Sequence, residues 1–185
     1  MIWVGIWVGS AMRSVEAVNG VDPNRLVIGF GNGVFESLDQ GSNIFVIGNG
    51  VRVNGSGVDP IAYGAAGNPD ALYIGSGDRV FARTAPTPAP VATLATFPGA
   101  GSGLSVTDIV LDPDDANRVF VTNTAAVYLT TDAGATWTNL TGNLQALVPS
   151  TVRSIALATT PLGDALVVGT QNGIYFATES TGFSN

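Results

Sequence analysis

The side chains able to do acid–base or nucleophilic chemistry in this chain are of few kinds. Its 185 residues include 14 Asp and Glu and seven Arg, but no Cys, His or Lys. This composition excludes thiol nucleophiles, imidazole bases, metal sites built on Cys or His, and Schiff-base chemistry. What remains is catalysis by paired carboxylates, as in glycoside hydrolysis, or the binding of an anionic ligand by arginines.

The spacing of the carboxylates favours turns over catalysis. Asp22, Asp59 and Asp112 each precede a proline, and Asp-Pro initiates turns. Glycoside hydrolysis needs two carboxyl groups about 5–5.5 Å or about 6.5–9.5 Å apart, and the spacing nominates no pair. The Asp-Pro-Asp-Asp run at 112–115 does not match the calcium-loop pattern, so we expect a solvated acidic loop, no metal and no other cofactor.

Net charge narrows the range of partners. The chain carries −7 at pH 7 with a pI near 4.2, which argues against nucleic acid and anionic lipid. The apolar N-terminal stretch is shorter than the roughly 20 residues that span a bilayer. Its first cation, Arg13, follows the stretch, which favours a buried strand over a signal peptide. We expect no membrane span. The lack of Lys favours a bacterial protein that is secreted or lies on the cell surface.

An aromatic residue recurs along the chain at a nearly constant interval. Phe35, Phe81, Tyr128 and Tyr175 are separated by 46, 47 and 47 residues. Before each lies an apolar strand and then a short turn, rich in Gly and Asn in three of the four copies. Strand, tight turn and strand is the pattern of a β-hairpin. Each unit therefore contains a hairpin, with a further apolar strand before it and another expected after it.

Four short strands in every ~45 residues predict an all-β protein, a β-propeller of about four four-stranded blades. The whole chain, 1–185, is one propeller region with blades near 14–50, 51–99, 104–148 and 151–185. No helix is expected, because Gly142 interrupts the best candidate, 140–148, and Pro149 follows it. Four blades are few for a closed ring, so we expect a small or partial propeller.

Two ways of completing the ring remain open. The chain is either part of a larger propeller, or two copies complete one ring. The last unit lacks its fourth strand, and residues 1–13 are expected to form an extra strand, which is a candidate to close that blade. Within this range, Trp3 to Val8 would supply the strand.

The units also resemble each other in pairs. Asn24-Arg25-Leu26 recurs as Asn117-Arg118-Val119 after 93 residues, and Asp70-Ala71-Leu72 recurs as Asp164-Ala165-Leu166 after 94. Units one and three are thus alike, as are two and four. Because a substrate clamp would break this symmetry, Arg25 and Arg118 are expected to have structural or surface roles. A Pro-rich segment, 85–90, is expected to be an extended and exposed connector.

One further motif repeats in register with the units. The pattern Ser/Thr-x-Asp-x-Gly-x-Thr-Trp is complete in unit three, and a decayed copy lies 93 residues earlier in unit one. Its residues are Thr130, Asp132, Gly134, Thr136 and Trp137 in unit three, and Ser37, Asp39 and Gly41 in unit one. We expect the carboxylate to accept backbone N–H groups across the turn after the third strand. The glycine would supply a positive φ, and the tryptophan would pack on the next blade.

This motif resembles the Asp box of the bacterial-neuraminidase-repeat (BNR) propellers, a group that includes sialidases, sortilin-type receptors, xyloglucan hydrolases and a photosystem II assembly factor. The resemblance covers roughly residues 14–180. It implies that the boxes lie at the propeller rim, away from a central site, with a structural role. The Phe/Tyr-Arg-Ile-Pro signature of sialidases is absent.

We therefore expect a non-catalytic interaction module that binds protein or glycan on one face. The alternative is a glycoside hydrolase, sialidase- or xyloglucanase-like, or a fragment of one. An assembly chaperone, the third option, needs an arginine patch that one sequence does not reveal.

Overall fold

A computed structural model describes residues 16–53, 60–147, 151–161, 163–179 and 183. Within them the chain forms four antiparallel sheets, here called sheets 1 to 4 in chain order. Sheet 1 contains β1 (Glu16–Val18), β2 (Leu26–Phe30), β3 (Gly33–Ser37) and β4 (Phe45–Asn49). Sheet 2 contains β5 (Ile61–Ala65), β6 (Asn68–Ser76), β7 (Arg79–Arg83) and β8 (Ala92–Thr93).

The other two sheets repeat this order. Sheet 3 contains β9 (Val106–Leu111), β10 (Val119–Asn123), β11 (Val127–Thr130) and β12 (Thr138–Asn139). Sheet 4 contains β13 (Val152–Thr160), β14 (Gly163–Thr170) and β15 (Gly173–Thr178). In every sheet each strand pairs with the next one along the chain. Two-residue turns join β2 to β3 and β14 to β15, and Phe30 pairs with Gly33 across the Gly-Asn turn.

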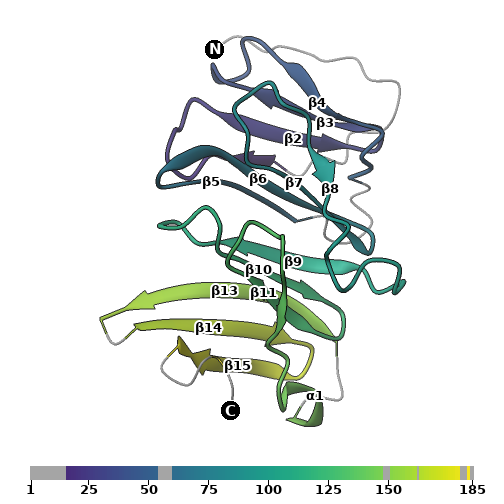
Figure 1. Cartoon of the computed structure of the whole chain (residues 1–185), viewed down its shortest axis with the longest axis vertical. Helices are drawn as coiled ribbons and strands as arrows, with labels where there is room; N and C mark the ends of the chain where they lie inside the picture. Colours follow the sequence, from purple (N-terminus) through teal and green to yellow (C-terminus); the bar gives the residue numbers. More distant parts are fainter. Residues whose placement is uncertain (1–15, 54–59, 148–150, 162, 180–182, 184–185) are drawn as a thin grey trace.

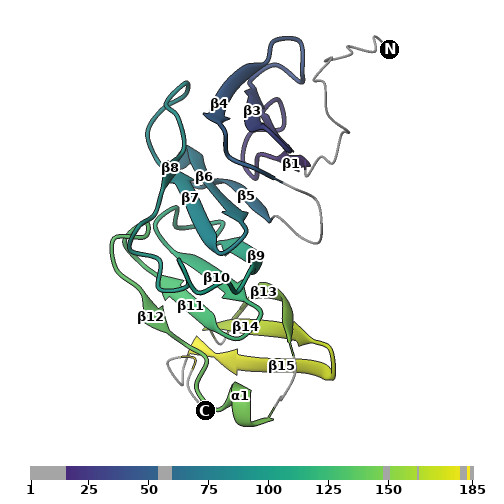
Figure 2. The same cartoon turned by 90° about the vertical axis from the view of Figure 1, so that its right-hand side faces the viewer.

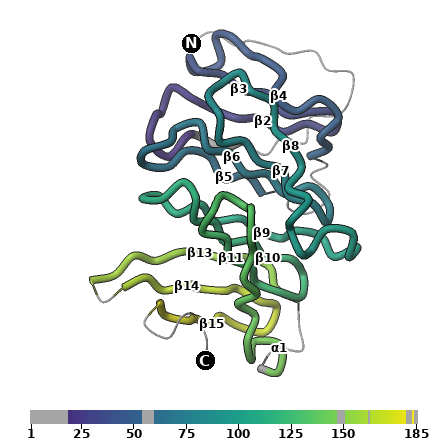
Figure 3. The backbone as a smooth tube through the Cα atoms, in the orientation of Figure 1, coloured from purple at the N-terminus to yellow at the C-terminus, as the bar shows by residue number. Residues whose placement is uncertain are grey.

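The four sheets follow one another along a curved path (Figures 1 and 2). In Figure 2, β1, β5, β9 and β13 lie on the concave side, while β4, β8 and β12 lie on the convex side. The tube in Figure 3 shows the chain completing each sheet before it begins the next. Sheets stacked in this way are the blades of a small, partial β-propeller. The all-β fold predicted from the repeat is therefore confirmed.

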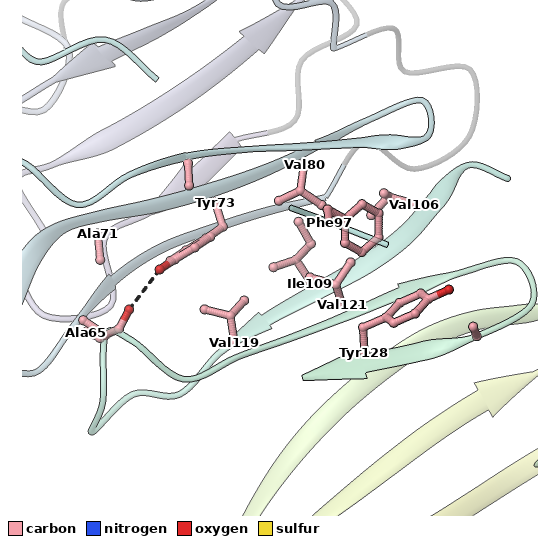
Figure 4. Close-up of a cluster of buried hydrophobic side chains, with 13 residues drawn as sticks. Ala65, Ala71, Tyr73, Val80, Phe97, Val106, Ile109, Val119, Val121 and Tyr128 are labelled. Carbon is pink, nitrogen blue, oxygen red and sulfur yellow. Dashed lines mark hydrogen bonds between the residues drawn. The ribbon is translucent and has the colours of Figure 1, made fainter. Parts of the chain in front are cut away.

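Three apolar clusters hold neighbouring sheets together. Val27 and Leu72 lie in the cluster between sheets 1 and 2, and Phe120 and Leu166 in the one between sheets 3 and 4. Between sheets 2 and 3, Tyr73 and Val121 belong to the largest cluster (Figure 4). Because β10 has a neighbouring sheet on each face, all five of its residues are buried. A strand covered on both faces reads as a continuous apolar run, as parallel-sheet strands also do.

The structure differs from the sequence expectations in a few places. A four-residue helix, α1 (Leu144–Leu147), lies where none was expected. Gly142, with φ +49°, precedes this helix and so does not interrupt it. The fourth strands of sheets 2 and 3, expected after each hairpin, are only two residues long. Residues 1–13, the expected extra strand, lie outside the described residues. No helix of the described chain is long and apolar enough to cross a membrane.

Candidate functional site

The unit-three motif folds into one turn between β11 and β12. Asp132 Oδ1 accepts the backbone N–H of Thr136 at 2.8 Å, and Asp132 Oδ2 accepts the Thr136 hydroxyl at 2.6 Å. The Thr130 hydroxyl donates to Asp132 Oδ1 and accepts the N–H of Gly134, both at 2.8 Å. Gly134 has φ +92°, where a Cβ would be strained. These donors hold the pKa of Asp132 at about 2.

The unit-one copy has the same geometry although its sequence is decayed. The Ser37 hydroxyl donates to Asp39 Oδ1 at 2.9 Å and accepts the N–H of Gly41 at 2.8 Å. Asn43 replaces the second threonine and donates its backbone N–H to Asp39 Oδ1 at 2.7 Å. Gly41 has φ +89°. A hydroxyl, a carboxylate and a glycine at this spacing are therefore enough to form the turn.

The unit-three turn packs on the preceding sheet, whereas the sequence expectation placed its tryptophan against the next blade. The rings of Trp137 and Phe97 meet edge to face with centroids 5.3 Å apart, and Phe97 follows β8 of sheet 2. The Thr96 hydroxyl donates to the carbonyl of Gly134. A Cβ on Gly134 would lie 2.5 Å from a methyl of Leu94. The turn thus joins two blades.

The repeated arginines bridge neighbouring sheets. Arg25 lies just before β2, and its Nη2 is 2.5 Å from Asp70 Oδ1 of sheet 2. Arg118 lies just before β10, and its Nη1 is 2.5 Å from Asp164 Oδ2 of sheet 4. Arg118 Nη1 also lies 2.9 Å from Asp112 Oδ2. Asp112 is therefore buried beside an arginine, and the expectation of a wholly solvated loop at 112–115 is wrong for this residue.

A fully buried carboxylate lies in the first of these interfaces. Glu36 of β3 accepts two hydrogen bonds from the Arg83 guanidinium, at 2.7 and 2.8 Å. The Tyr63 hydroxyl and the Thr87 hydroxyl also donate to it. Burial alone would raise the pKa of Glu36, but the Arg83, Tyr63 and Thr87 donors hold it below its usual value. Thr87 belongs to the Pro-rich segment, so one side chain of this otherwise largely exposed connector points inward.

These interfaces bring carboxylates together without making an acid–base pair. Glu36 and Asp70 both accept the Thr87 hydroxyl, at 2.8 and 3.0 Å. Burial opposes ionisation of both, yet their arginine and threonine donors lower the pKa of each. A glycosidase needs one carboxyl that stays protonated to donate to the leaving group. Two carboxylates that are both held ionised cannot supply it.

Asp108 has the opposite electrostatic character. It lies on β9, on the concave side of the arc in Figure 2. Burial raises its pKa, opposed only in part by the N–H groups of Ile155 and Ile109, which its carboxylate accepts at 2.9 Å. The bond to Ile155 joins β9 to β13 of the next sheet. Sequence reasoning did not select Asp108 or Glu36, although each is an acid inside an otherwise apolar strand.

A hollow lies at the edge of sheet 4. A pocket of about 350 Å³ opens between β14, β15 and the segment that leads into α1. Its lining is mostly apolar and includes Leu140, Leu144, Leu166, Val168, Tyr175 and Phe183. In sheets 1 to 3 the strand holding the repeated aromatic pairs with a fourth strand. Within the described residues no strand pairs with β15 on that side, and the pocket opens there.

Solved structures with a similar fold are glycoside hydrolases much longer than this chain. A GH74 enzyme from Niastella koreensis matches at 16% identity and TM-score 0.68, over 90% of this chain and 28% of that one. The GH74 xyloglucanase from Xanthomonas campestris matches at 17% and 0.63, over 91% and 29%. An ancestral GH74 enzyme matches at 18% and 0.63, over 90% and 24%.

This chain therefore spans less than a third of the enzymes it resembles. No protein-family model and no curated protein matches the sequence. At these identities the similarity shows the propeller fold and nothing finer about activity.

Proposed function

We propose that the chain is a non-catalytic β-propeller module of the Asp-box type that binds an extended segment of a partner protein at the edge of sheet 4. The observation that carries this proposal is the pocket beside β15, at the position that a fourth strand occupies in the other three sheets. A strand added there gains backbone hydrogen bonds from the sheet edge, and an apolar side chain would fill the pocket.

The placement of the charged groups supports the absence of catalysis. Asp39 and Asp132 are used inside turns, and Asp70 and Asp164 are paired with arginines between sheets. Glu36 has no exposed surface at all. A substrate would therefore meet none of these groups in a reactive state. Their arrangement supports a scaffold whose function lies in what its surface binds.

An array that holds extended peptides and neutral and acidic oligosaccharides tests the proposal. We expect the protein to bind peptides with alternating apolar residues, and Tyr175→Ala and Leu144→Ala to weaken that binding. Val21→Ala, at an exposed apolar residue of sheet 1, is the matched control and should leave it unchanged. If the protein bound only oligosaccharides, its ligand would be a glycan and the proposal of a protein ligand would be wrong.

A glycoside hydrolase is the second candidate, and Asp108 is the observation that favours it. A half-buried carboxyl with a raised pKa on the concave side of a propeller has the character of a general acid. Incubation with xyloglucan and other oligosaccharides tests this function. If the native protein released reducing sugar and Asp108→Asn did not, the chain would be a glycoside hydrolase and not a non-catalytic binding module.

A further inference from the structure

The outer face of sheet 4 is apolar and exposed. Leu157, Leu166 and Ala177 pack towards sheet 3, and side chains alternate between the two faces of a strand. Ala156, Val167 and Phe176, which pair across the three strands, therefore point the other way. Phe176 is 70% exposed and Ile174 is 77% exposed. We call Ala156, Ala165, Val167, Ile174 and Phe176 the C-terminal face.

The opposite end of the stack has an apolar face as well. Val27 and Val34 pack towards sheet 2, so Ile28, Phe35 and Val46, which pair across β2, β3 and β4, point away from it. Val46 is 53% exposed. We call Leu26, Ile28, Phe35 and Val46 the N-terminal face.

Counterparts of these two faces already pack against each other in the middle of the molecule. The residues that sheet 2 presents to sheet 3 include Ala62, Ala71, Tyr73, Val80 and Ala82. Each lies 94 positions before a member of the C-terminal face, and all five members are apolar. Figure 4 shows this contact, with Tyr73 and Val80 of sheet 2 above Val119, Val121 and Tyr128 of sheet 3.

The residues of sheet 3 in this contact have counterparts in sheet 1. Val119, Val121 and Tyr128 lie 93 positions after Leu26, Ile28 and Phe35 of the N-terminal face. The sheet 2–sheet 3 interface is thus the pairing that the two end faces would make. The residues named here are apolar in both sheets, whereas Ile109 of the same contact has Glu16 as its counterpart.

We propose that the C-terminal face of one chain packs on the N-terminal face of a second copy, head to tail, and that two copies close a ring of eight sheets. Eight blades lie within the range of known propellers. One type of contact, used twice, closes the pair around a two-fold axis and leaves neither end face exposed. Ile174 and Phe176 also line the pocket, but the proposed contact uses the outer face of sheet 4, whereas the proposed function uses the free edge of β15.

Sedimentation equilibrium of the 185-residue chain tests the mass. We expect a reversible species of twice the chain mass of 18.8 kDa. Phe176→Lys and Ile28→Lys should each weaken it by roughly a hundredfold or more, because their counterparts Ala82 and Val121 are buried in the sheet 2–sheet 3 contact and an unpaired ammonium would be buried there. Leu104→Lys, at an exposed apolar residue between β8 and β9, is the control and should stay dimeric. Circular dichroism would show that each variant keeps its sheets.

Mixing the two lysine variants tests the head-to-tail arrangement. Each alone has an altered residue in both contacts, but a mixed pair has one contact with no substitution. The mixture should therefore regain dimer at concentrations where each variant alone is monomeric. A monomeric native chain, species larger than the dimer, a dimeric Ile28→Lys variant, or a mixture that stays monomeric would each overturn the proposal.

Discussion

Arg25 and Asp70 form an ion pair between sheets 1 and 2, with Nη2 2.5 Å from Oδ1, and the pair recurs between sheets 3 and 4 as Arg118 and Asp164. Both partners recur at the repeat spacing, the arginine after 93 residues and the aspartate after 94. The structural unit that repeats is therefore a pair of sheets with its connecting ion pair. Between sheets 2 and 3 the contact is an apolar cluster.

The two equivalent interfaces differ in their interior, and the difference predicts the result of a transplant. Glu36, Tyr63 and Arg83 correspond to Leu129, Leu157 and Ala177, which pack together between sheets 3 and 4. Glu36→Leu alone leaves the Arg83 charge buried, and we expect it to lower the free energy of unfolding by about 3–5 kcal/mol. Adding Tyr63→Leu and Arg83→Ala should recover part of the loss, since the buried guanidinium is removed, while the smaller apolar set leaves a cavity.

Urea denaturation of the native protein, the single variant and the triple variant measures this effect. Leu129→Ala is the matched control, because it should cost stability by loss of apolar contact alone. A triple variant that is less stable than Glu36→Leu would show that the buried ions stabilise the interface beyond what packing supplies.

The indole of Trp137 contributes packing without a hydrogen bond. Its Nε1 is buried, and no acceptor reaches it within the described structure. Trp137→Phe keeps a ring next to Phe97 and removes an unsatisfied donor, so the free energy of unfolding should change by less than about 1 kcal/mol. Trp137→Ala should cost about 2 kcal/mol or more. Thermal unfolding of the two variants would distinguish them, and an equal loss in both would mean that the indole N–H has a partner in solution.

The fold was accessible from the sequence because its signals are local and repeated. The aromatic interval fixed the number of sheets, and Gly-Asn or Asn-Gly pairs marked two of the hairpin turns. The turn between β11 and β12 was predictable because the side-chain bonds of Thr130 and Asp132 stay within the motif.

Glu36 and Arg83 were not predictable, because they are 47 residues apart and meet only when two sheets stack. The contact of Trp137 with Phe97 has the same cause. Nothing in the spacing says which neighbouring blade a side chain will touch.

The Asp132 turn predicts an acid transition confined to low pH. The Thr136 and Thr130 donors place its folded pKa at about 2, below the ordinary value of about 3.9. A carboxyl whose pKa is lowered by folding stabilises the fold at pH values above its ordinary pKa. This stabilisation is lost as the pH falls from about 4 to about 2. Carbon-detected NMR titration of the carboxyl should report the low value, and Thr136→Val should raise it. Thr131→Val, at the neighbouring exposed residue, should leave it unchanged.

Asp108 predicts a pH dependence of the opposite sign. Burial raises its folded pKa, so its protonated form is favoured by folding. The stabilisation is present below the ordinary pKa and is lost as the pH rises through the raised value.

Asp108→Asn stays neutral at every pH and keeps an oxygen that can accept the N–H of Ile155. We therefore compare the free energy of unfolding of this variant with that of the native protein at each pH. The difference should favour the variant more at pH 7 than at pH 4. Urea denaturation at both pH values measures the difference, with Asp114→Asn, an exposed acid of the next loop, as the control. If Asp108→Asn instead lost more stability at pH 7 than at pH 4, the ionised carboxylate would be the form that holds β9 to β13, and Asp108 could not serve as a protonated general acid.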